Sequence, residues 1–314
     1  MSFTNFPNGI TSFGVPVGAP NIFGKPWFVD SDGGSNSQDG KSPDHPLATL
    51  QKAVDLASSW DTIYVAGTAN NALTQVDDYD EEVTIPVTKI GITLQGCGGG
   101  PEGVLWGPSA ENKTLLTINS NNCRVNGFRL RPYGATGHAI DLLRTTTENQ
   151  AGTIIKNCTF RSQTTPAYGI YSTGGPNDVT VKDCIFDSVL GAIYMPTALT
   201  NVPHRWVVKD VQINGNCSSG IDGSFRRSLF ERVVVADLDG GMMLDTDHEP
   251  VSVGYDNRVK DCAFGDANSA IAEVNGSATD GWQGSYFGKP LDQVLVVSVE
   301  TGLFLLSPDG LTST

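Results

Sequence analysis

The acidic segment 237–249 holds the richest cluster of side chains able to do chemistry, and it reads DLDGGMMLDTDHE. Alternate side chains of a β-strand point to the same face, so Asp245, Asp247 and Glu249 would share one face. Asp222 could lie beside them on a preceding strand. Paired carboxyl groups can act as acid and as base or nucleophile in the cleavage of a glycosidic bond. The same oxygens could bind Ca²⁺, or the segment could be a solvated acidic loop.

Two features argue against catalysis in this segment. Pro250 directly follows Glu249, and the cluster has no aromatic residue beside it to stack on a sugar ring. The four His residues also lack the Ser/His/Asp or His/Glu spacing of known catalytic and metal motifs. We therefore expect a protein that is not an enzyme, with no catalytic residue, no metal and no cofactor. Asp245, Asp247 and Glu249 remain the candidates if a glycan is cleaved.

Composition excludes several classes of function. The chain has 314 residues and a formal charge of −14, so it lacks the basic surface of a nucleic-acid-binding protein. No apolar run approaches the roughly 20 residues of a membrane span. The first nine residues have no basic and apolar segments of a signal peptide. Six cysteines without a CxxC motif argue against zinc, and we expect them to be free thiols that pack as small apolar residues.

A repeat from residue 124 onward is the strongest indication of fold. One motif, apolar-Lys/Arg-Asp/Asn-Cys/Val-x-Phe/Val, recurs with markers at positions 126, 157, 183, 210, 232 and 261. A second motif, Gly-x-Ile-like, follows each copy, with apolar markers at 140, 170, 193, 221, 242 and 271. Units that cannot bury their apolar residues alone do so by stacking. The two columns predict an all-β right-handed parallel β-helix rather than a β-sandwich.

The rest of the chain completes this organisation. We expect residues 1–24 to form an apolar arm. Residues 25–60 are expected to contain a strand and a helix near 47–58 that caps the first coil. In this helix Leu50, Val54 and Ala57 make a narrow apolar stripe, with Thr49 or Asp44 as the N-cap. The β-helix would span 61–306, and a polar tail 307–314.

Residues 28–65 resemble the opening of pectate-lyase-like parallel β-helix proteins. The resemblance lies in FVD at 28–30, DGKSP at 39–43, HPLATLQKAVD at 45–55 and DTIYV at 61–65. It extends over about residues 26–300 and implies the fold far more than an activity. Members include enzymes as well as spikes, adhesins and particle components.

The segment NFPNGITSFGVPV at 5–17 is similar to the N-termini of structural proteins of tailed bacteriophages. That resemblance implies a virion protein on the capsid exterior, made in the host cytoplasm. We expect a homotrimeric capsid decoration or cement protein that binds the major capsid protein, and neither nucleic acid nor membrane. The alternative is a tailspike-like protein that binds or depolymerises a host surface glycan. The docking residues would be Phe6, Pro7, Ile10, Phe13, Val15 and Pro16.

Overall fold

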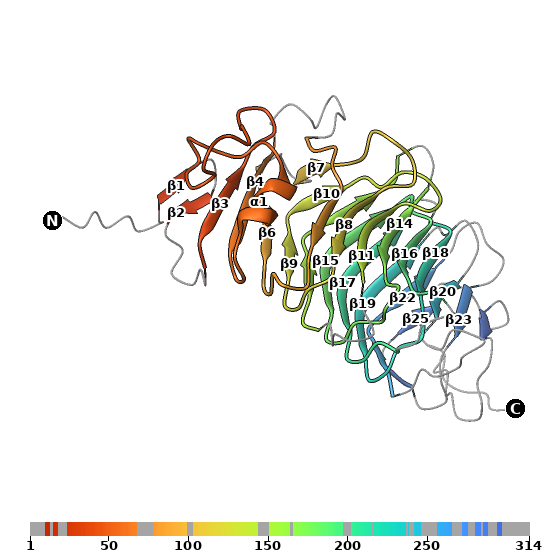
Figure 1. Ribbon diagram of the computed structural model, residues 1–314. Helices are drawn as coiled ribbons and strands as arrows, with labels where there is room; N and C mark the ends of the chain where they lie inside the picture. Colours follow the sequence, from red (N-terminus) through yellow and green to blue (C-terminus); the bar gives the residue numbers. More distant parts are fainter. Residues whose placement is uncertain are drawn as a thin grey trace, which may run out of the picture.

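The computed structural model shows strands that stack in sequence order along one axis, as the colour change in Figure 1 shows. Two large sheets run along this axis, and all the strand pairs described in them are parallel. The structure describes residues 10–12, 15–17, 24–67, 78–98, 103–143, 151–163, 166–196, 202–214, 217–236, 238, 242–245, 256–265, 272–275, 280–283, 285–287 and 294–296.

The larger sheet has a main path of strands that are far apart in sequence but adjacent in space. Short strands pair beside it: β7 (Val104–Trp106), β10 (Phe128–Leu130), β13 (Thr159–Arg161), β22 (Ala263–Gly265) and β25 (Tyr286–Phe287). The main path comprises β3 (Pro26–Val29), β4 (Thr62–Gly67), β6 (Thr93–Gly98), β9 (Arg124–Asn126), β12 (Ile154–Lys156), β15 (Thr180–Asp187), β17 (Val207–Asn214), β19 (Leu229–Ala236), β21 (Arg258–Lys260) and β24 (Gly281–Gln283).

The smaller sheet repeats the same arrangement with one strand per unit. Its order is β5 (Val83–Ile85), β8 (Thr114–Ile118), β11 (His138–Leu142), β14 (Tyr168–Tyr171), β16 (Gly191–Tyr194), β18 (Ser219–Asp222), β20 (Met242–Asp245), β23 (Ala272–Asn275) and β26 (Val294–Val296). The two parallel sheets confirm the predicted all-β parallel β-helix and exclude the β-sandwich, in which antiparallel pairing dominates.

The Asp/Asn column of the first motif has a backbone cause. Asn157, Asp183, Asp210 and Asp261 all have φ between 49° and 54°. This left-handed conformation is costly for most side chains, and Asn and Asp tolerate it best after Gly. The register aligns Asn126 with Lys156, so Gly127 and not Asn126 occupies this column. The predicted marker at 126 was therefore one residue off.

The interior is filled by like residues stacked over like. Phe160 and Phe186 are fully buried, with ring centroids 4.4 Å apart and an interplanar angle of 7°. Cys184 is in register with Val211, and that residue with Val233, so the predicted inward Cys/Val column is present. Five of the six free cysteines are buried, and Cys97 is partly exposed.

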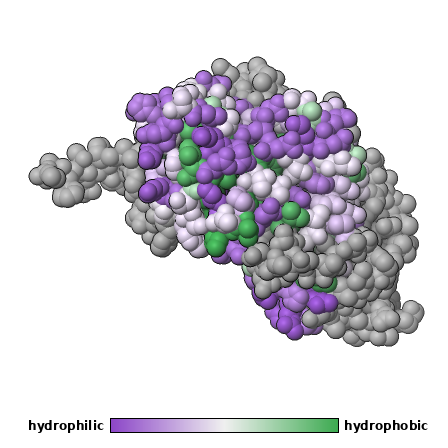
Figure 2. Space-filling view, viewed as in Figure 1, coloured by the Kyte–Doolittle hydropathy of each residue, from purple (hydrophilic) through white to green (hydrophobic). Residues whose placement is uncertain are grey.

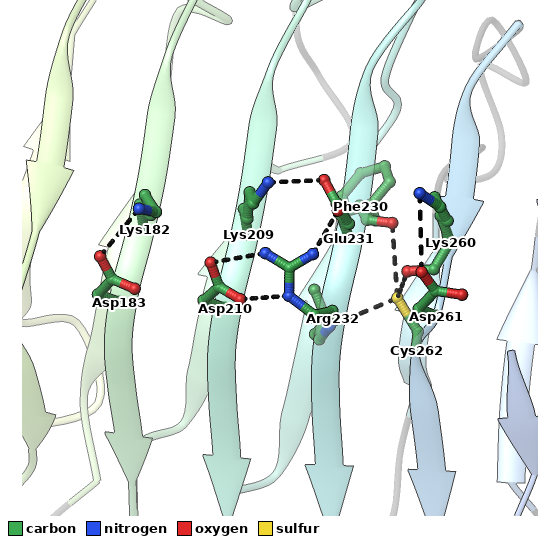
Figure 3. Close-up of polar contacts among 11 residues, drawn as sticks. Lys182, Asp183, Lys209, Asp210, Phe230, Glu231, Arg232, Lys260, Asp261 and Cys262 are labelled. Carbon is green, nitrogen blue, oxygen red and sulfur yellow. Dashed lines mark hydrogen bonds and ion pairs between the residues drawn. The ribbon is translucent and has the colours of Figure 1, made fainter. Parts of the chain in front are cut away.

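The outer face of the larger sheet carries a ladder of ion pairs (Figure 3). Arg232 reaches Asp210 on the neighbouring strand with two N–O distances of 2.6 and 3.0 Å, and it also pairs with Glu231. Lys209 lies 3.0 Å from the same Glu231. These pairs lie on the outer surface of the sheet, where solvent screens the charges, so they contribute little to stability. In the view of Figure 2 the described surface is mostly hydrophilic, with small separate hydrophobic patches.

The helix α1 (Leu50–Leu56) packs against β3, β4 and β5. The Thr49 hydroxyl caps it by accepting from the Lys52 N–H, which confirms the predicted N-cap. The Glu81 carboxylate accepts two further N–H groups of the first turn, from Leu50 at 2.6 Å and Gln51 at 3.0 Å. These bonds satisfy N–H groups that have no partner within a helix. The helix is shorter than the predicted 47–58.

The two ends of the chain are described only in part. β1 (Ile10–Ser12) and β2 (Val15–Val17) pair as an antiparallel hairpin, with Ile10 opposite Val17. The rest of the expected arm and the tail 307–314 lie outside the described residues. Among the described residues, no helix is long and apolar enough to cross a membrane.

Candidate functional site

One outward column of the smaller sheet joins tyrosines to carboxylates. In each strand the residue after a buried aliphatic side chain faces outward, because Ile140, Ile170, Ile193 and Ile221 point into the core. The register therefore places the following residues side by side on neighbouring strands. They are, in order, Asp141, Tyr171, Tyr194, Asp222 and Asp245.

The second predicted motif needs a correction at its last two copies. The structure pairs Ile221 with Leu244, and Leu244 with Val274, rather than with Met242 and Ile271. A register irregularity lies between Met242 and Leu244. That irregularity lies in the pairing of β20 with β23. The regular pairing of Ile221 with Leu244, between β18 and β20, places Asp245 directly beside Asp222, one strand spacing of about 4.8 Å away along the sheet.

The aromatic residues form a connected cluster with His138 and Tyr168 of the neighbouring outward column. His138 stacks on Tyr171 with centroids 3.9 Å apart and an angle of 11°. Tyr168 stacks on Tyr194 at 4.8 Å, and Tyr171 lies 5.7 Å from Tyr194. Such contacts fix the rings, since each pair adds about 0.5–1.5 kcal/mol beyond burial. The cluster is only partly exposed and offers aromatic surface on the outer face of the sheet.

Burial changes the titration of two groups at this cluster. It lowers the pKa of His138 to about 4, so the imidazole is neutral at pH 7. Burial also raises the pKa of Asp141 to about 6, although the Thr173 hydroxyl, which donates to its carboxylate at 3.4 Å, opposes the shift. Asp222 is close enough to raise the pKa of both Tyr168 and Tyr194, after the larger effect of burial. The site thus combines aromatic rings with carboxyl groups of different environments.

Only one pair of these carboxylates has the spacing for glycosidic cleavage. Asp141 and Asp222 are three strands apart, about 14 Å, which exceeds the roughly 5–9.5 Å that separates the two carboxyl groups in glycosidases. Asp222 and Asp245 are on adjacent strands, close to the spacing of retaining enzymes. Asp245 is 4% exposed, and Asp222 is intermediate. This pair can supply one proton donor and one base or nucleophile.

The structure supports part of the predicted site. It places Asp245 next to Asp222, as the sequence suggested, whereas Asp247 and Glu249 lie outside the described residues. The expectation that the cluster has no aromatic neighbours was wrong, because Tyr194 is adjacent to Asp222. The tyrosines were missed because they precede Asp245 by 51 and 74 residues. The signal that could have found them is the position that follows each apolar marker.

The described residues also limit the other predicted sites. Among them, no group of three or more His, Cys, Asp or Glu side chains is placed to hold a metal ion. Of the predicted docking residues, Ile10, Val15 and Pro16 belong to the β1–β2 hairpin. Phe6, Pro7 and Phe13 lie outside the described residues.

Comparison with known proteins defines the fold class. No protein-family model and no curated protein matches this chain. Among solved structures, the GH136 lacto-N-biosidase from Eubacterium ramulus is similar in two structures, a selenomethionine derivative with a TM-score of 0.58 and the native protein with 0.52. Each is 11% identical over 84% of this chain and 55% of the enzyme. The pectate lyase Pel9A is similar at a TM-score of 0.46 and 11% identity, over 84% of this chain and 74% of that one.

These similarities correct one expectation. The chain was expected not to be an enzyme, whereas the lacto-N-biosidase whose fold it resembles is one. At 11% identity the likeness shows the fold alone, a parallel β-helix. The chain also spans only about half the length of the biosidase.

Proposed function

We propose that this protein binds a glycan on the outer face of the smaller sheet and cleaves it there. One observation carries the proposal: the tyrosine cluster and the Asp222–Asp245 pair occupy successive positions of one outward column. Aromatic faces stack on the apolar faces of sugar rings, and a carboxyl pair supplies the acid and base for the glycosidic bond. The likeness in fold to a lacto-N-biosidase supports the choice of substrate class.

The proposed roles follow from position. Tyr171 and Tyr194 form the platform that holds the chain of sugars along the sheet. One carboxyl of the pair protonates the glycosidic oxygen as the bond to the anomeric carbon breaks. The other attacks that carbon and forms a glycosyl-enzyme ester, and a water molecule deprotonated by the first carboxylate then hydrolyses this ester. Asp141, at the far end of the platform, is too distant to share the reaction and contacts a bound sugar instead.

The test is cleavage by matched variants. We expect the wild type to release reducing ends from at least one substrate of a panel that contains lacto-N-oligosaccharides, neutral β-glucans and polygalacturonate. Asp222→Asn and Asp245→Asn should each lower the rate by a factor of 10² or more, because one removes the acid and base and the other the nucleophile. Asp261→Asn, an exposed carboxylate on the larger sheet, is the control and should leave the rate unchanged.

Two results would overturn this assignment. One is cleavage at the wild-type rate by the Asp222→Asn/Asp245→Asn double variant, with circular dichroism showing an intact β-helix. The other is failure of the wild type to cleave any substrate of the panel under conditions in which it also fails to bind one. Tyr171→Ala should weaken binding, which separates the platform from the chemistry.

We also propose that the β-helix is displayed on a bacteriophage virion as a homotrimer. The sequence of residues 5–17 supports this proposal because it is similar to phage structural proteins. Its many apolar residues also need a partner surface on which to be buried. Three linked arms would bind a capsid more tightly than one. Deletion of residues 1–24 should abolish attachment to the particle and leave glycan cleavage intact. Full attachment of the truncated protein would refute the role of the arm.

A further inference from the structure

A second cleft opens on the larger sheet, near the N-terminal end of the β-helix. Its volume is about 770 Å³, within the range of ligand sites. It lies on a different sheet from the tyrosine cluster and shares no residue with it. The lining residues come from β4, β6, β9 and the segments just before them: Gly24, Ser59, Trp60, Thr62, Tyr64, Gly91, Thr93, Gln95, Asn122 and Arg124.

One wall of the cleft is an exposed indole held in a fixed position. Trp60 is 47% exposed and has a left-handed φ of 71°, a conformation that bulky residues rarely adopt. A Cβ atom on Gly91 would overlap the indole ring, so glycine there lets the ring lie against the backbone. The backbone N–H of Trp60 donates to the Ile90 carbonyl at 2.7 Å. The indole is therefore a preformed platform rather than a loose surface side chain.

The floor of the cleft is polar and ordered by the register of the strands. Thr62, Thr93 and Arg124 stand in one row across β4, β6 and β9. Gln95 is fixed in the neighbouring row, where its Oε1 accepts from Asn126 at 2.6 Å and its Nε2 donates to the Gly96 carbonyl at 2.8 Å. Hydroxyl and amide groups beside an aromatic face suit a ligand rich in hydroxyl groups.

Among the described residues that line the cleft, Arg124 is the one that is charged. It is exposed, and it forms no ion pair with any described residue, unlike Arg205 and Arg232, which each bind an aspartate through two N–O contacts. A guanidinium group binds carboxylate, sulfate or phosphate oxygens with two parallel hydrogen bonds. The described part of the lining contains no carboxylate and no second cation, so its charge suits one anionic group.

We propose that this cleft binds a saccharide unit that carries one anionic group. The sugar ring lies on the Trp60 indole, and its anionic substituent pairs with Arg124. Thr62, Thr93 and Asn122 offer hydrogen bonds to the ring hydroxyls. The site is independent of the proposed cleavage site, and it gives the protein a second hold on a charged glycan from another side of the rod.

The experiment is a ligand-observed NMR titration of the full chain with glucose, glucuronate, glucose 6-phosphate and inorganic phosphate. We expect glucuronate or glucose 6-phosphate to bind at least tenfold more tightly than both glucose and inorganic phosphate. The stronger of the two shows whether a carboxylate or a phosphate is the preferred group. Saturation transfer should be strongest at the ring protons, which would face the indole.

Two arginine variants complete the design. Arg124→Gln should remove the preference for the charged sugar, whereas Arg258→Gln should keep it, because Arg258 occupies the same row of the sheet five strands away. Equal binding of the four probes, or an unchanged preference in Arg124→Gln, would overturn the proposal. Both variants should retain glycan cleavage, so failure of this site is distinguishable from failure of the proposed function.

Discussion

Replacement of Asp141 by Asn should stabilise the protein, and by more at high pH than at low pH. Burial raises the pKa of this carboxyl from its ordinary 3.8 to about 6, so the folded state holds the proton more tightly than the unfolded chain. The cost of the charged form is absent below about pH 3.8, grows as the pH rises and is complete above about pH 6. A rise of about two in the pKa corresponds to a loss of roughly 3 kcal/mol in the free energy of unfolding at high pH.

The Asn side chain has no charge to bury, but it also accepts a weaker hydrogen bond from Thr173 than the carboxylate does. We therefore expect a gain of about 1–2 kcal/mol at pH 8 in the free energy of unfolding, falling below about 0.5 kcal/mol at pH 4. The nearby His138 has the opposite pH dependence, because its lowered pKa destabilises the fold as the pH falls below 6.5. The difference between variant and wild type cancels that term.

The assay is urea unfolding followed by circular dichroism at pH 4, 6 and 8, for the wild type and the variant. Asp261→Asn is the control: it is an exposed aspartate, and its effect should be small and independent of pH. A loss of stability on Asp141→Asn at pH 8, or a gain of the same size at pH 4 and pH 8, would refute the argument that a buried charge is the cause.

Two further predictions concern the stack of coils. Phe186→Ala should lower the free energy of unfolding by about 3–5 kcal/mol in the same assay, because it leaves a cavity beside Phe160. The control Ile185→Ala, on the exposed face, should lower it by less than about 1 kcal/mol. Equal effects of the two variants would show that the core is not packed as described. Asp210→Val should lower the melting temperature more than Asp210→Gly, because a β-branched residue is strained at φ 54°. Both variants lose the ion pair to Arg232, so this loss does not separate them. The opposite order would show that backbone conformation does not set the preference for Asp at position 210.

The sequence predicts the fold well because each coil repeats the same constraint. Successive coils place a left-handed residue at the same point, and Asn157, Asp183 and Asp210 mark it at intervals of 26 and 27 residues. The marker at 126 failed because Gly127 meets the same need with a different residue type. The end of α1 was overestimated because apolar spacing continues to Ala57, whose extended backbone (ψ 151°) ends the helix.

The candidate site was predicted only in part, for a different reason. Asp222 and Asp245 could be paired because they come from consecutive units, although the predicted marker at Met242 hid the register, which pairs Ile221 with Leu244. Tyr171 and Tyr194 belong to earlier units, and their approach to the carboxylates appears only when the coils are stacked. Outward residues obey no packing rule, so the repeat that reveals the core says little about the surface beside it.

The stacked register also has a consequence for how such a protein could change over generations. Because β14, β16 and β18 pair through equivalent positions, duplication or loss of one whole unit would leave both flanking ends compatible. A loss of the unit that contains Tyr194 would move Tyr171 next to Asp222, and a duplication would lengthen the aromatic track by one strand spacing. The distance between the place where a polymer is held and the place where it is cut would then vary in discrete steps of about 4.8 Å.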